Sequence, residues 1–258
     1  MPLPVIAVPG WLHAAESLAP LRDCLETQSG IGPVTVLDGL PDGPPFEDAV
    51  LDSALRAHPG CVLVGWSLGA LRCLAAALRQ PATTRALVLL APTARFLADA
   101  NPDYPGTAPV ALRAMRRRLR TDPLGCAGDF LRACHAPRNV APERIARAAA
   151  HAAEQGSTAT RDAGLVWLEK ADFRDRLAGL SLPVWLLHGT EDRIVPIAQG
   201  EWLARNLENA THVVFPGVGH VPDAAMWRAA ADAVVEAGAL SCSNSQYGLR
   251  TPVTLRHG

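Results

Sequence analysis

Short apolar runs alternate with segments of helical periodicity in the first and last thirds of the chain, and this alternation limits the fold most strongly. We predict strands at residues 3–8, 34–38, 61–65 and 86–90, with helices between them at 17–28, 46–58 and 68–79. Two later strands are each followed by a helix, in the order 184–188, 198–206, 211–215 and 223–237. Such alternation is typical of an α/β fold with a mostly parallel central sheet and helices on both faces.

The middle third of the chain has no strand signal. Residues 93–180 are rich in Ala, Arg and Leu at helical spacing, interrupted by short turns that contain Asn, Pro or Gly. We therefore expect a core made of residues 1–92 and 181–239, with residues 93–180 inserted after the fourth strand as a helical lid. A lid at that place can cover the carboxyl edge of the sheet, where open α/β sheets bind ligands. Residues 240–258 lack periodicity, and we expect a disordered tail there.

Composition and charge exclude several classes of protein. Hydrophobic residues make up 49% of the 258 residues and charged residues 19%, which is typical of a globular protein. A net charge of -1 gives no general attraction to nucleic acid or to an anionic membrane. No signal peptide or membrane span is evident, and the six cysteines lack paired spacing. We expect a cytoplasmic monomer with reduced thiols that binds neither nucleic acid nor a membrane.

Residues 65–69 read Gly-Trp-Ser-Leu-Gly and match the G-x-S-x-G pattern of a nucleophile elbow. An apolar strand runs into Gly65, and an apolar-periodic helix begins directly after Ser67. Glycines suit these places because the turn strains the backbone at the serine and brings strand and helix close together. This setting favours Ser67 as a nucleophile. The alternative is a serine that only caps the helix.

A serine nucleophile needs a histidine base and a carboxylate that orients the base. Asp192 lies four residues past the strand at 184–188, and His220 lies five residues past the last strand. Both therefore fall at the carboxyl edge of the sheet, and the order Ser, Asp, His along the chain is that of α/β-hydrolases. Glu191 is the alternative acid, and His188 is the alternative base.

Acyl transfer also needs donors for the negative charge that develops on the carbonyl oxygen. The backbone N–H of Leu68 follows the nucleophile, and that of Trp11 follows the first strand, although Trp11 could instead be a core aromatic. His13 lies in the same loop and is expected to border the cleft. No metal-ligand spacing and no glycine-rich nucleotide pattern is present, so we expect neither a metal nor another cofactor.

Several segments resemble the pimeloyl-[acyl-carrier protein] methyl ester esterases of biotin synthesis, which are α/β-hydrolases. The resemblance covers about residues 3–237 and is carried by residues 9–11, 65–69, 85–92 and 168–177. It implies an α/β-hydrolase fold and a serine carboxylesterase that cleaves the methyl ester of a carrier-bound pimeloyl chain through an acyl-enzyme. Ser67 would attack, His220 would act as base and then as acid, and Asp192 would orient His220.

The same resemblance implies which residues contact the substrate. Trp11 and Leu68 would contact the ester. The acyl chain would be lined by a stretch of the lid that comprises Phe130, Leu131, Arg132, Ala133 and Cys134. One departure from the family pattern is Pro9, which stands where these hydrolases usually have His.

Arginines of the lid form a further candidate surface. Residues 95–150 hold ten Arg against five Asp or Glu, and four of the arginines lie three or four residues apart on one predicted helix face. Acyl-carrier proteins are acidic, so a basic lid can attract them. The expected contacts with an acyl-carrier protein are Arg113, Arg116, Arg117, Arg120, Arg144 and Arg147. The alternative is a solvated helix face in an arginine-rich chain.

Two other functions stay open. A serine esterase or C–C bond hydrolase for free small acyl substrates would share every catalytic residue and differ only in the lid. A non-catalytic hydrolase fold that binds a ligand or a partner would need none of them. Haloalkane dehalogenase and epoxide hydrolase chemistry is disfavoured, because both need Asp at the elbow where this chain has Ser67.

Overall fold

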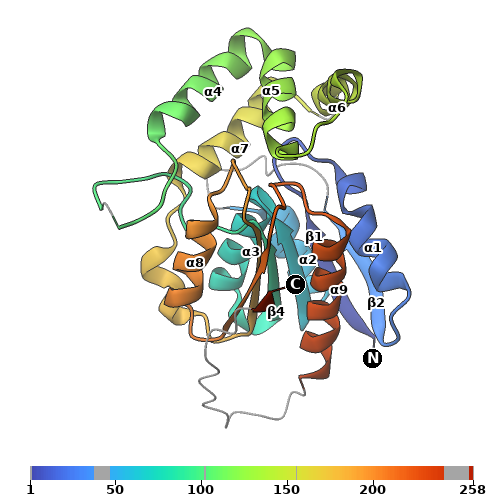
Figure 1. Ribbon diagram of the computed structural model, residues 1–258. Coiled ribbons are helices and arrows are strands. Elements are labelled where there is room, and N and C mark those ends of the chain that lie inside the picture. Colours follow the sequence, from blue (N-terminus) through green and yellow to red (C-terminus); the bar gives the residue numbers. More distant parts are fainter. Residues whose placement is uncertain (1, 38–46, 102, 155, 241–255, 258) are drawn as a thin grey trace.

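A single parallel sheet forms the centre of the computed structural model, which describes residues 2–37, 47–101, 103–154, 156–240 and 256–257 (Figure 1). Among these residues the sheet has seven strands in the order β2-β1-β3-β4-β5-β6-β7, and every neighbouring pair is parallel. The strands are β1 (Leu3–Val8), β2 (Ile31–Val36), β3 (Cys61–Trp66), β4 (Thr84–Leu90), β5 (Val184–Gly189), β6 (Ala210–Phe215) and β7 (Arg256–His257). The predicted α/β fold with its mostly parallel sheet is thus confirmed.

Two strands differ most from prediction, whereas the bounds of β1, β3, β4, β5 and β6 agree with it to within two residues. β2 begins at Ile31 rather than at 34, because Gly30 takes a φ of 84° and its carbonyl already accepts the N–H of Leu3 at 2.8 Å. β7 was not predicted, and it pairs with β6 inside the region that we expected to be disordered. A strand of two residues is too short to show the alternation of apolar and polar side chains by which strands are recognised in a sequence. It is defined here only by its pairing with β6. The rest of that predicted tail beyond residue 240 lies outside the described residues.

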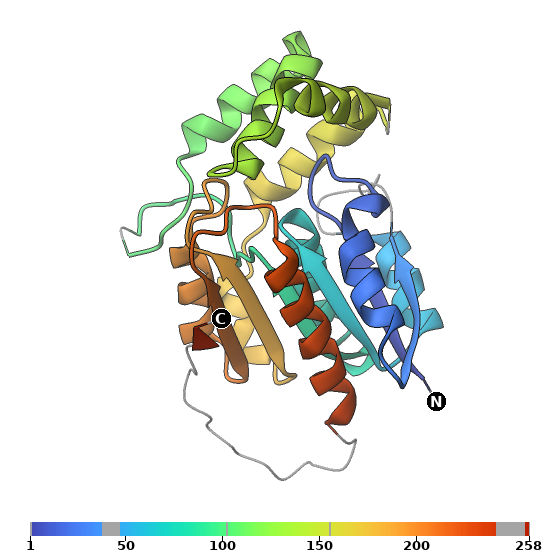
Figure 2. The ribbon, with the colours of Figure 1, turned by 45° about the vertical axis from the view of Figure 1, so that its right-hand side comes forward.

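Helices cover both faces of the sheet (Figures 1 and 2). One face carries α1 (Ala19–Glu26) and α9 (Ala224–Ala239), and the other carries α2 (Ala49–Ala57), α3 (Leu68–Arg79) and α8 (Ile197–Asn206). Successive residues of a strand point to opposite faces, so Val62 and Val64 join the core beneath α1 and α9 while Leu63 joins the core beneath α3. Short 3-10 turns occur at Ala15–Leu18, Pro81–Thr83 and Arg174–Gly179.

Between β4 and β5 the chain leaves the sheet and forms further helices over its carboxyl end (Figures 1 and 2). They are α4 (Pro109–Thr121), α5 (Pro123–His135), α6 (Pro142–Glu154) and α7 (Thr158–Lys170). Leu112 of α4 and Leu165 of α7 belong to the same apolar core as α3, so the inserted helices are packed onto the sheet domain. No helix in the described ranges is long and apolar enough to cross a bilayer.

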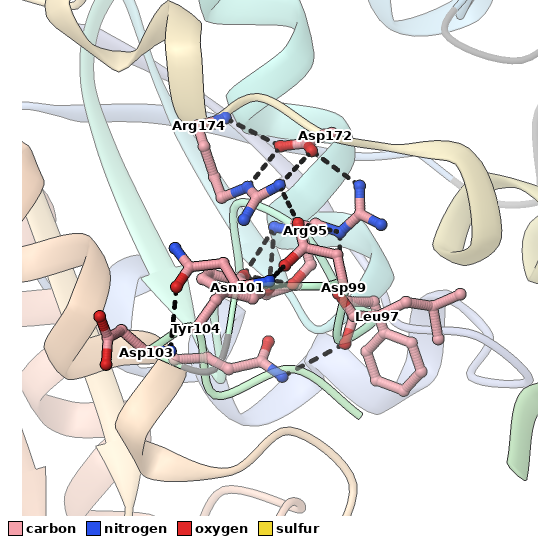
Figure 3. A network of polar contacts seen from close by, with 11 residues as sticks. Arg95, Leu97, Asp99, Asn101, Asp103, Tyr104, Asp172 and Arg174 are labelled. Atoms are coloured by element: carbon pink, nitrogen blue, oxygen red, sulfur yellow. Dashed lines mark hydrogen bonds and ion pairs between the residues drawn. The ribbon is translucent and has the colours of Figure 1, made fainter. Parts of the chain in front are cut away.

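A polar network ties together the two connections of the inserted helices (Figure 3). Asp172, after α7, accepts a hydrogen bond of 2.7 Å from Nη1 of Arg95, which follows β4. The same carboxylate accepts hydrogen bonds of 2.9 and 2.7 Å from Arg174, whose guanidinium also lies 4.7 Å from the centre of the Tyr104 ring. Tyr104 in turn donates to the carbonyl of Arg95. Entry to and exit from the insertion are therefore held side by side.

Replacing Asp172 by Asn should lower the free energy of unfolding at pH 7 by about 1 kcal/mol. Partial burial acts to raise the pKa of Asp172, but hydrogen bonds from Arg174 and Arg95 outweigh it and lower the pKa from 3.8 to about 2. A folded-state pKa below the unfolded value stabilises the fold above about pH 4, and this stabilisation is lost as the pH falls towards 2. Urea titrations between pH 3 and 7 should show the wild-type advantage shrinking with acid.

The exposed Asp175 gives a matched control for this prediction. Asp175→Asn should leave the unfolding free energy within about 0.5 kcal/mol of wild type at each pH. An Asp172→Asn variant whose deficit did not change between pH 3 and 7 would show that the carboxylate does not act through its charge.

Candidate active site

Ser67 stands in a strained turn between β3 and α3. Its backbone has φ 58° and ψ -118°, a region that is costly for residues other than glycine. A Cβ at Gly65 would lie 2.6 Å from the Cα of Ala70, so strand and helix can approach this closely only with glycine there. The Ser67 hydroxyl makes no capping hydrogen bond to α3. The structure thus gives this side chain a partner other than the helix.

That partner is His220. The Oγ of Ser67 lies 2.9 Å from Nε2 of His220, and Nδ1 of the same ring lies 2.8 Å from Oδ2 of Asp192. All three residues are buried, with at most 9% of their surface exposed. Residues 67, 192 and 220 follow β3, β5 and β6, and parallel strands bring these loops to one edge of the sheet. The structure therefore joins hydroxyl, imidazole and carboxylate in hydrogen-bonding order.

Asp192 is held ionised in its buried position. Its Oδ1 accepts the backbone N–H groups of Ile194 and Val195 at 2.8 and 2.9 Å. Burial acts to raise the pKa of this carboxyl, but the nearby imidazoles of His220 and His188 outweigh it and hold the pKa well below its usual value. A carboxylate that stays charged at neutral pH can orient the His220 ring and stabilise its protonated form.

The alternative acid and base occupy other places. Glu191 is exposed, and its backbone N–H is bonded to the carbonyl of Val218 at 2.9 Å. His188 is fully buried, with Nε2 2.9 Å from the carbonyl of Val195 and 3.5 Å from Oδ2 of Asp192. It contacts the carboxylate beside His220, where it supports the charge of Asp192.

The loop after β1 comes next to the Ser67 turn. A Cβ at Gly10 would lie 3.2 Å from the Cβ of Ser67, and a Cβ at Gly69 would lie 2.1 Å from the carbonyl oxygen of Val8. Leu68 is the first residue of α3, where backbone N–H groups have no acceptor within the helix. The carboxyl end of β1 and the amino end of α3 thus meet around the hydroxyl.

Gly69→Ala should destabilise the protein by about 3 kcal/mol or more, because its methyl group would collide with backbone rather than with a flexible side chain. Gly128→Ala on α5 is the matched control, since a Cβ there meets no atom within 4 Å. That control should gain up to about 1 kcal/mol from helix propensity. Urea denaturation of both variants measures the difference. Equal stabilities would contradict the close approach of α3 to β1.

Trp11 and His13 shape the same loop. Trp11 is 1% exposed, its Nε1 donates to the carbonyl of Arg161 at 2.9 Å, and its ring meets Phe130 edge-on at 4.8 Å. It is therefore both a core aromatic and a neighbour of the site. His13 places Nδ1 2.8 Å from the carbonyl of Trp11 and its ring 4.2 Å from that of Trp66. Burial lowers the pKa of His13 to about 3, so this ring stays neutral at pH 7.

A cavity of about 180 Å³ opens beside Ser67. Its walls come from the loop after β1, the segment after β4, α4, α5, α7 and the loop after Asp192, and most of the residues are apolar. They are Trp11, Ser67, Thr93, Phe96, Thr107, Ala111, Leu112, Met115, Phe130, Leu165, Leu168, Arg193, Ile194 and Val195. The cavity suits an apolar acyl chain better than a charged one.

Only Phe130 of the predicted acyl-lining stretch borders this cavity. Leu131 packs between α5 and α6 in a separate apolar cluster, and the side chain of Arg132 is 63% exposed and paired with Asp129. Ala133 lines a neighbouring depression, and Cys134 is fully buried. Five consecutive residues of a helix point in different directions, so a contiguous stretch cannot line one cavity.

Sequence reasoning missed the apolar wall formed by α4 and α7 and the part played by Trp66. The indole Nε1 of Trp66 donates to the carbonyl of His220 at 3.0 Å, which holds the loop that carries the imidazole. Its place inside the Gly-Trp-Ser-Leu-Gly motif could have drawn attention to it. The residues of α4 and α7 that line the cavity carry no such signal in the sequence, because the packing of the inserted helices decides which of their side chains face Ser67.

The lid arginines separate into two groups. Arg116 makes two hydrogen bonds of 2.8 Å to Asp162 and a further ion pair with Glu169, both on α7, which raises the pKa of its guanidinium. It joins two inserted helices and does not face solvent freely. The remaining members of the predicted carrier surface are exposed, and they are Arg113, Arg117, Arg120, Arg144 and Arg147.

Within the described residues, no group of three His, Cys, Asp or Glu side chains could hold a metal ion.

Comparison with known proteins identifies relatives over most of the chain. The family model described as "Alpha/beta hydrolase family" matches residues 5–237. A pimeloyl-[acyl-carrier protein] methyl ester esterase of Neisseria meningitidis serogroup A is 36% identical over 74% of this chain and 63% of its own length. The enzyme of the same name from Neisseria meningitidis serogroup B is 35% identical over 74% of this chain and 76% of its own length. The one from Aromatoleum aromaticum is 32% identical over 71% of this chain and 76% of its own length.

Solved structures agree on the fold. A bromoperoxidase from Bacillus anthracis superimposes with a TM-score of 0.78 at 18% identity, covering 92% of each chain. An esterase from Exiguobacterium antarcticum gives a TM-score of 0.76 at 17% identity, covering 92% of this chain and 91% of its own. The family match, the parallel sheet and the elbow after β3 lead to one conclusion. The chain belongs to the alpha/beta hydrolase family, as a relative of the pimeloyl-[acyl-carrier protein] methyl ester esterases.

Proposed function

We propose that the protein is a serine carboxylesterase that works through an acyl-enzyme. The observation that carries this proposal is the buried chain of hydrogen bonds from Ser67 through His220 to Asp192, at 2.9 and 2.8 Å, beside an apolar cavity. A hydrogen-bonded serine, histidine and carboxylate in this order activate a hydroxyl for acyl transfer. Esterases among the relatives add independent support.

The reaction would begin when Nε2 of His220 takes the proton of Ser67 and Oγ attacks the ester carbonyl. The resulting oxyanion would be stabilised by the backbone N–H groups of Trp11 and Leu68, each worth about 3 kcal/mol of barrier. Protonated His220, stabilised by Asp192, would then give its proton to the departing alcohol. A water molecule, activated by His220, would cleave the acyl-enzyme and release the acid. The proton of Ser67 thus leaves with the alcohol, and the proton that His220 takes from water passes to Oγ of Ser67, so both side chains regain their starting states.

The substrate that we propose is a methyl ester at the far end of a pimeloyl chain carried by an acyl-carrier protein, as an intermediate of biotin synthesis. Relatives named for this substrate align with most of the chain, and the cavity beside Ser67 is apolar along its walls. The exposed arginines of α4 and α6 would attract the acidic carrier. These are Arg113, Arg117, Arg120, Arg144 and Arg147.

A serine esterase for free small acyl esters is the second candidate. It is favoured by the position of Arg116, which lies in the middle of the predicted carrier surface but is paired with α7. Such an enzyme would use the same three catalytic residues and need no carrier.

Steady-state kinetics on two substrates with the same acyl group tests the proposal. The purified protein should hydrolyse the carrier-linked pimeloyl methyl ester with a higher kcat/KM than free dimethyl pimelate. It should also restore growth of a biotin auxotroph that lacks its own esterase. Equal kcat/KM for the two esters, together with failure to restore growth, would favour the second candidate. Hydrolysis of neither ester by folded protein would contradict both.

A further inference from the structure

A second cavity, of about 590 Å³, lies next to the active site on the other side of Arg193. It is formed by the end of α5, the loop that follows and the start of α6, and we call it the α5 groove. Its lining residues are Arg132, His135, Ala136, Pro137, Arg138, Asn139, Val140, Ala141, Pro142 and Arg193. Among these lining residues there are three arginines and one histidine but no Asp or Glu, so the groove has a strongly positive lining.

The basic groups of the α5 groove are only partly used by the protein. Arg138 donates from Nη2 to the carbonyl of Val221 at 2.7 Å, and Arg132 is paired with Asp129 while remaining 63% exposed. Arg193 is exposed and has no ion-pair partner among the described residues. The half-buried His135 has a lowered pKa, first because of burial and then because of the charges of Arg138 and Arg144. A bound anion would relieve this accumulation of like charge.

The α5 groove lies directly against the loops that carry the catalytic acid and base. Arg193 follows Asp192 in the chain and borders both the cavity beside Ser67 and the groove. A Cβ at Gly219 would lie 1.8 Å from the carbonyl oxygen of Ala136, so the floor of the groove touches the residue before His220. The N–H of Val221 also donates to the carbonyl of Cys134 at 3.1 Å. Arg193 thus lies at the boundary between the two cavities.

We infer that the α5 groove binds a phosphate group of the substrate while the ester lies at Ser67. Guanidinium groups match phosphate oxygens with paired, charge-assisted hydrogen bonds, and three of them line this groove. Val140, Ala141 and Pro142 supply apolar walls for the uncharged part of an acyl arm. The ligand class is an acyl thioester on a phosphopantetheine arm, whose phosphate can belong to a carrier protein or to a small thioester. This inference rests on the proposed function.

The groove differs from the arginine surface expected on α4. Arg113, Arg117 and Arg120 lie on α4, the helix that also carries Arg116, and Arg116 is paired with Asp162 of α7. None of these arginines lines the groove. The groove residues belong to the end of α5, the loop that follows it, the start of α6 and the loop after Asp192, and the first and last of these lie next to the catalytic groups. A phosphate subsite here would fix how far an acyl chain extends towards Ser67.

Binding to the catalytically inactive Ser67→Ala protein tests the inference without any turnover. Calorimetry should show 4'-phosphopantetheine binding about 10-fold more tightly than pantetheine, since a hydrogen-bonded charge pair contributes on that order. Arg193→Gln with Arg132→Gln, introduced together, should abolish the difference. Arg205→Gln, at an exposed site on α8, should keep it. Equal binding of the two compounds to the parent protein would overturn the inference.

A second arm uses holo-acyl-carrier protein as the probe. If the groove binds the phosphate, the double variant should lose affinity for free 4'-phosphopantetheine and for the carrier by similar factors. Loss of carrier affinity alone would overturn the inference, because the variant would then have removed a contact with the carrier's protein surface. Because these assays measure binding, a protein that binds the phosphate yet hydrolyses no ester would refute the proposed function and leave the groove assignment in place.

Discussion

Ser67→Ala should lower kcat for a methyl ester by about 10⁴- to 10⁶-fold while the protein stays folded. Removing the hydroxyl removes the attacking atom, and the remaining rate would come from oxyanion stabilisation and substrate binding alone. The fold should survive because the Oγ of Ser67 bonds to His220 and does not cap α3. The residue also keeps a Cβ, so the strained backbone is no worse for alanine than for serine.

Circular dichroism and urea denaturation check the folded state of this variant, and single-turnover kinetics check its rate. Ser17→Ala is a matched control, since Ser17 also bonds through its hydroxyl, to the carbonyl of Ala14 at 2.6 Å, but outside the active site. It should keep kcat within about 2-fold of wild type. A Ser67→Ala protein that retained a tenth of the wild-type rate would show that another group attacks the ester.

Asp192→Asn should lower kcat by about 10⁴-fold with little change in the shape of the site. The reason lies in how the carboxylate is bound. Its Oδ1 accepts the N–H groups of Ile194 and Val195, so the oxygen of an asparagine amide would be kept at that position. The amide NH₂ would then face His220, where it can donate but cannot accept. His220 would have to carry its proton on Nε2 and could not receive one from Ser67.

Glu191→Gln is the matched control for this second prediction. It changes the neighbouring carboxylate to an amide at an exposed position, and kcat should stay within about 2-fold of wild type. Steady-state rates across pH 5 to 9 compare the two variants. A fall of less than 10-fold in Asp192→Asn, or an equal fall in Glu191→Gln, would contradict the role of Asp192 in orienting His220.

The sequence was sufficient for the fold and for the three residues that the structure brings together at the sheet edge. The strands are short and apolar, and the parallel arrangement sends the residue after each strand to one edge. Ser67 stands in a local motif, and Asp192 and His220 each lie a few residues beyond a strand. They meet because β3, β5 and β6 lie close together in one parallel sheet, so the loops after these strands share an edge.

The contacts of the inserted helices could not be predicted in the same way. Which side of α5 faces Ser67 depends on how that helix rotates against α4 and α7, and this rotation is set by distant packing partners. Phe130 faces the cavity while Leu131 does not, although the two are adjacent and both apolar. The pairing of Arg116 with Asp162 and Glu169 likewise joins residues that are far apart in the sequence.

The most direct test of the proposed mechanism is reaction of the native protein with a fluorophosphonate, followed by mass spectrometry of its peptides. We predict one phosphonyl group per chain, attached to Ser67, with the rate of labelling reduced by at least about 100-fold in His220→Ala. A folded sample that stays unlabelled, or that is labelled at another residue, would contradict the assignment of Ser67 as the nucleophile.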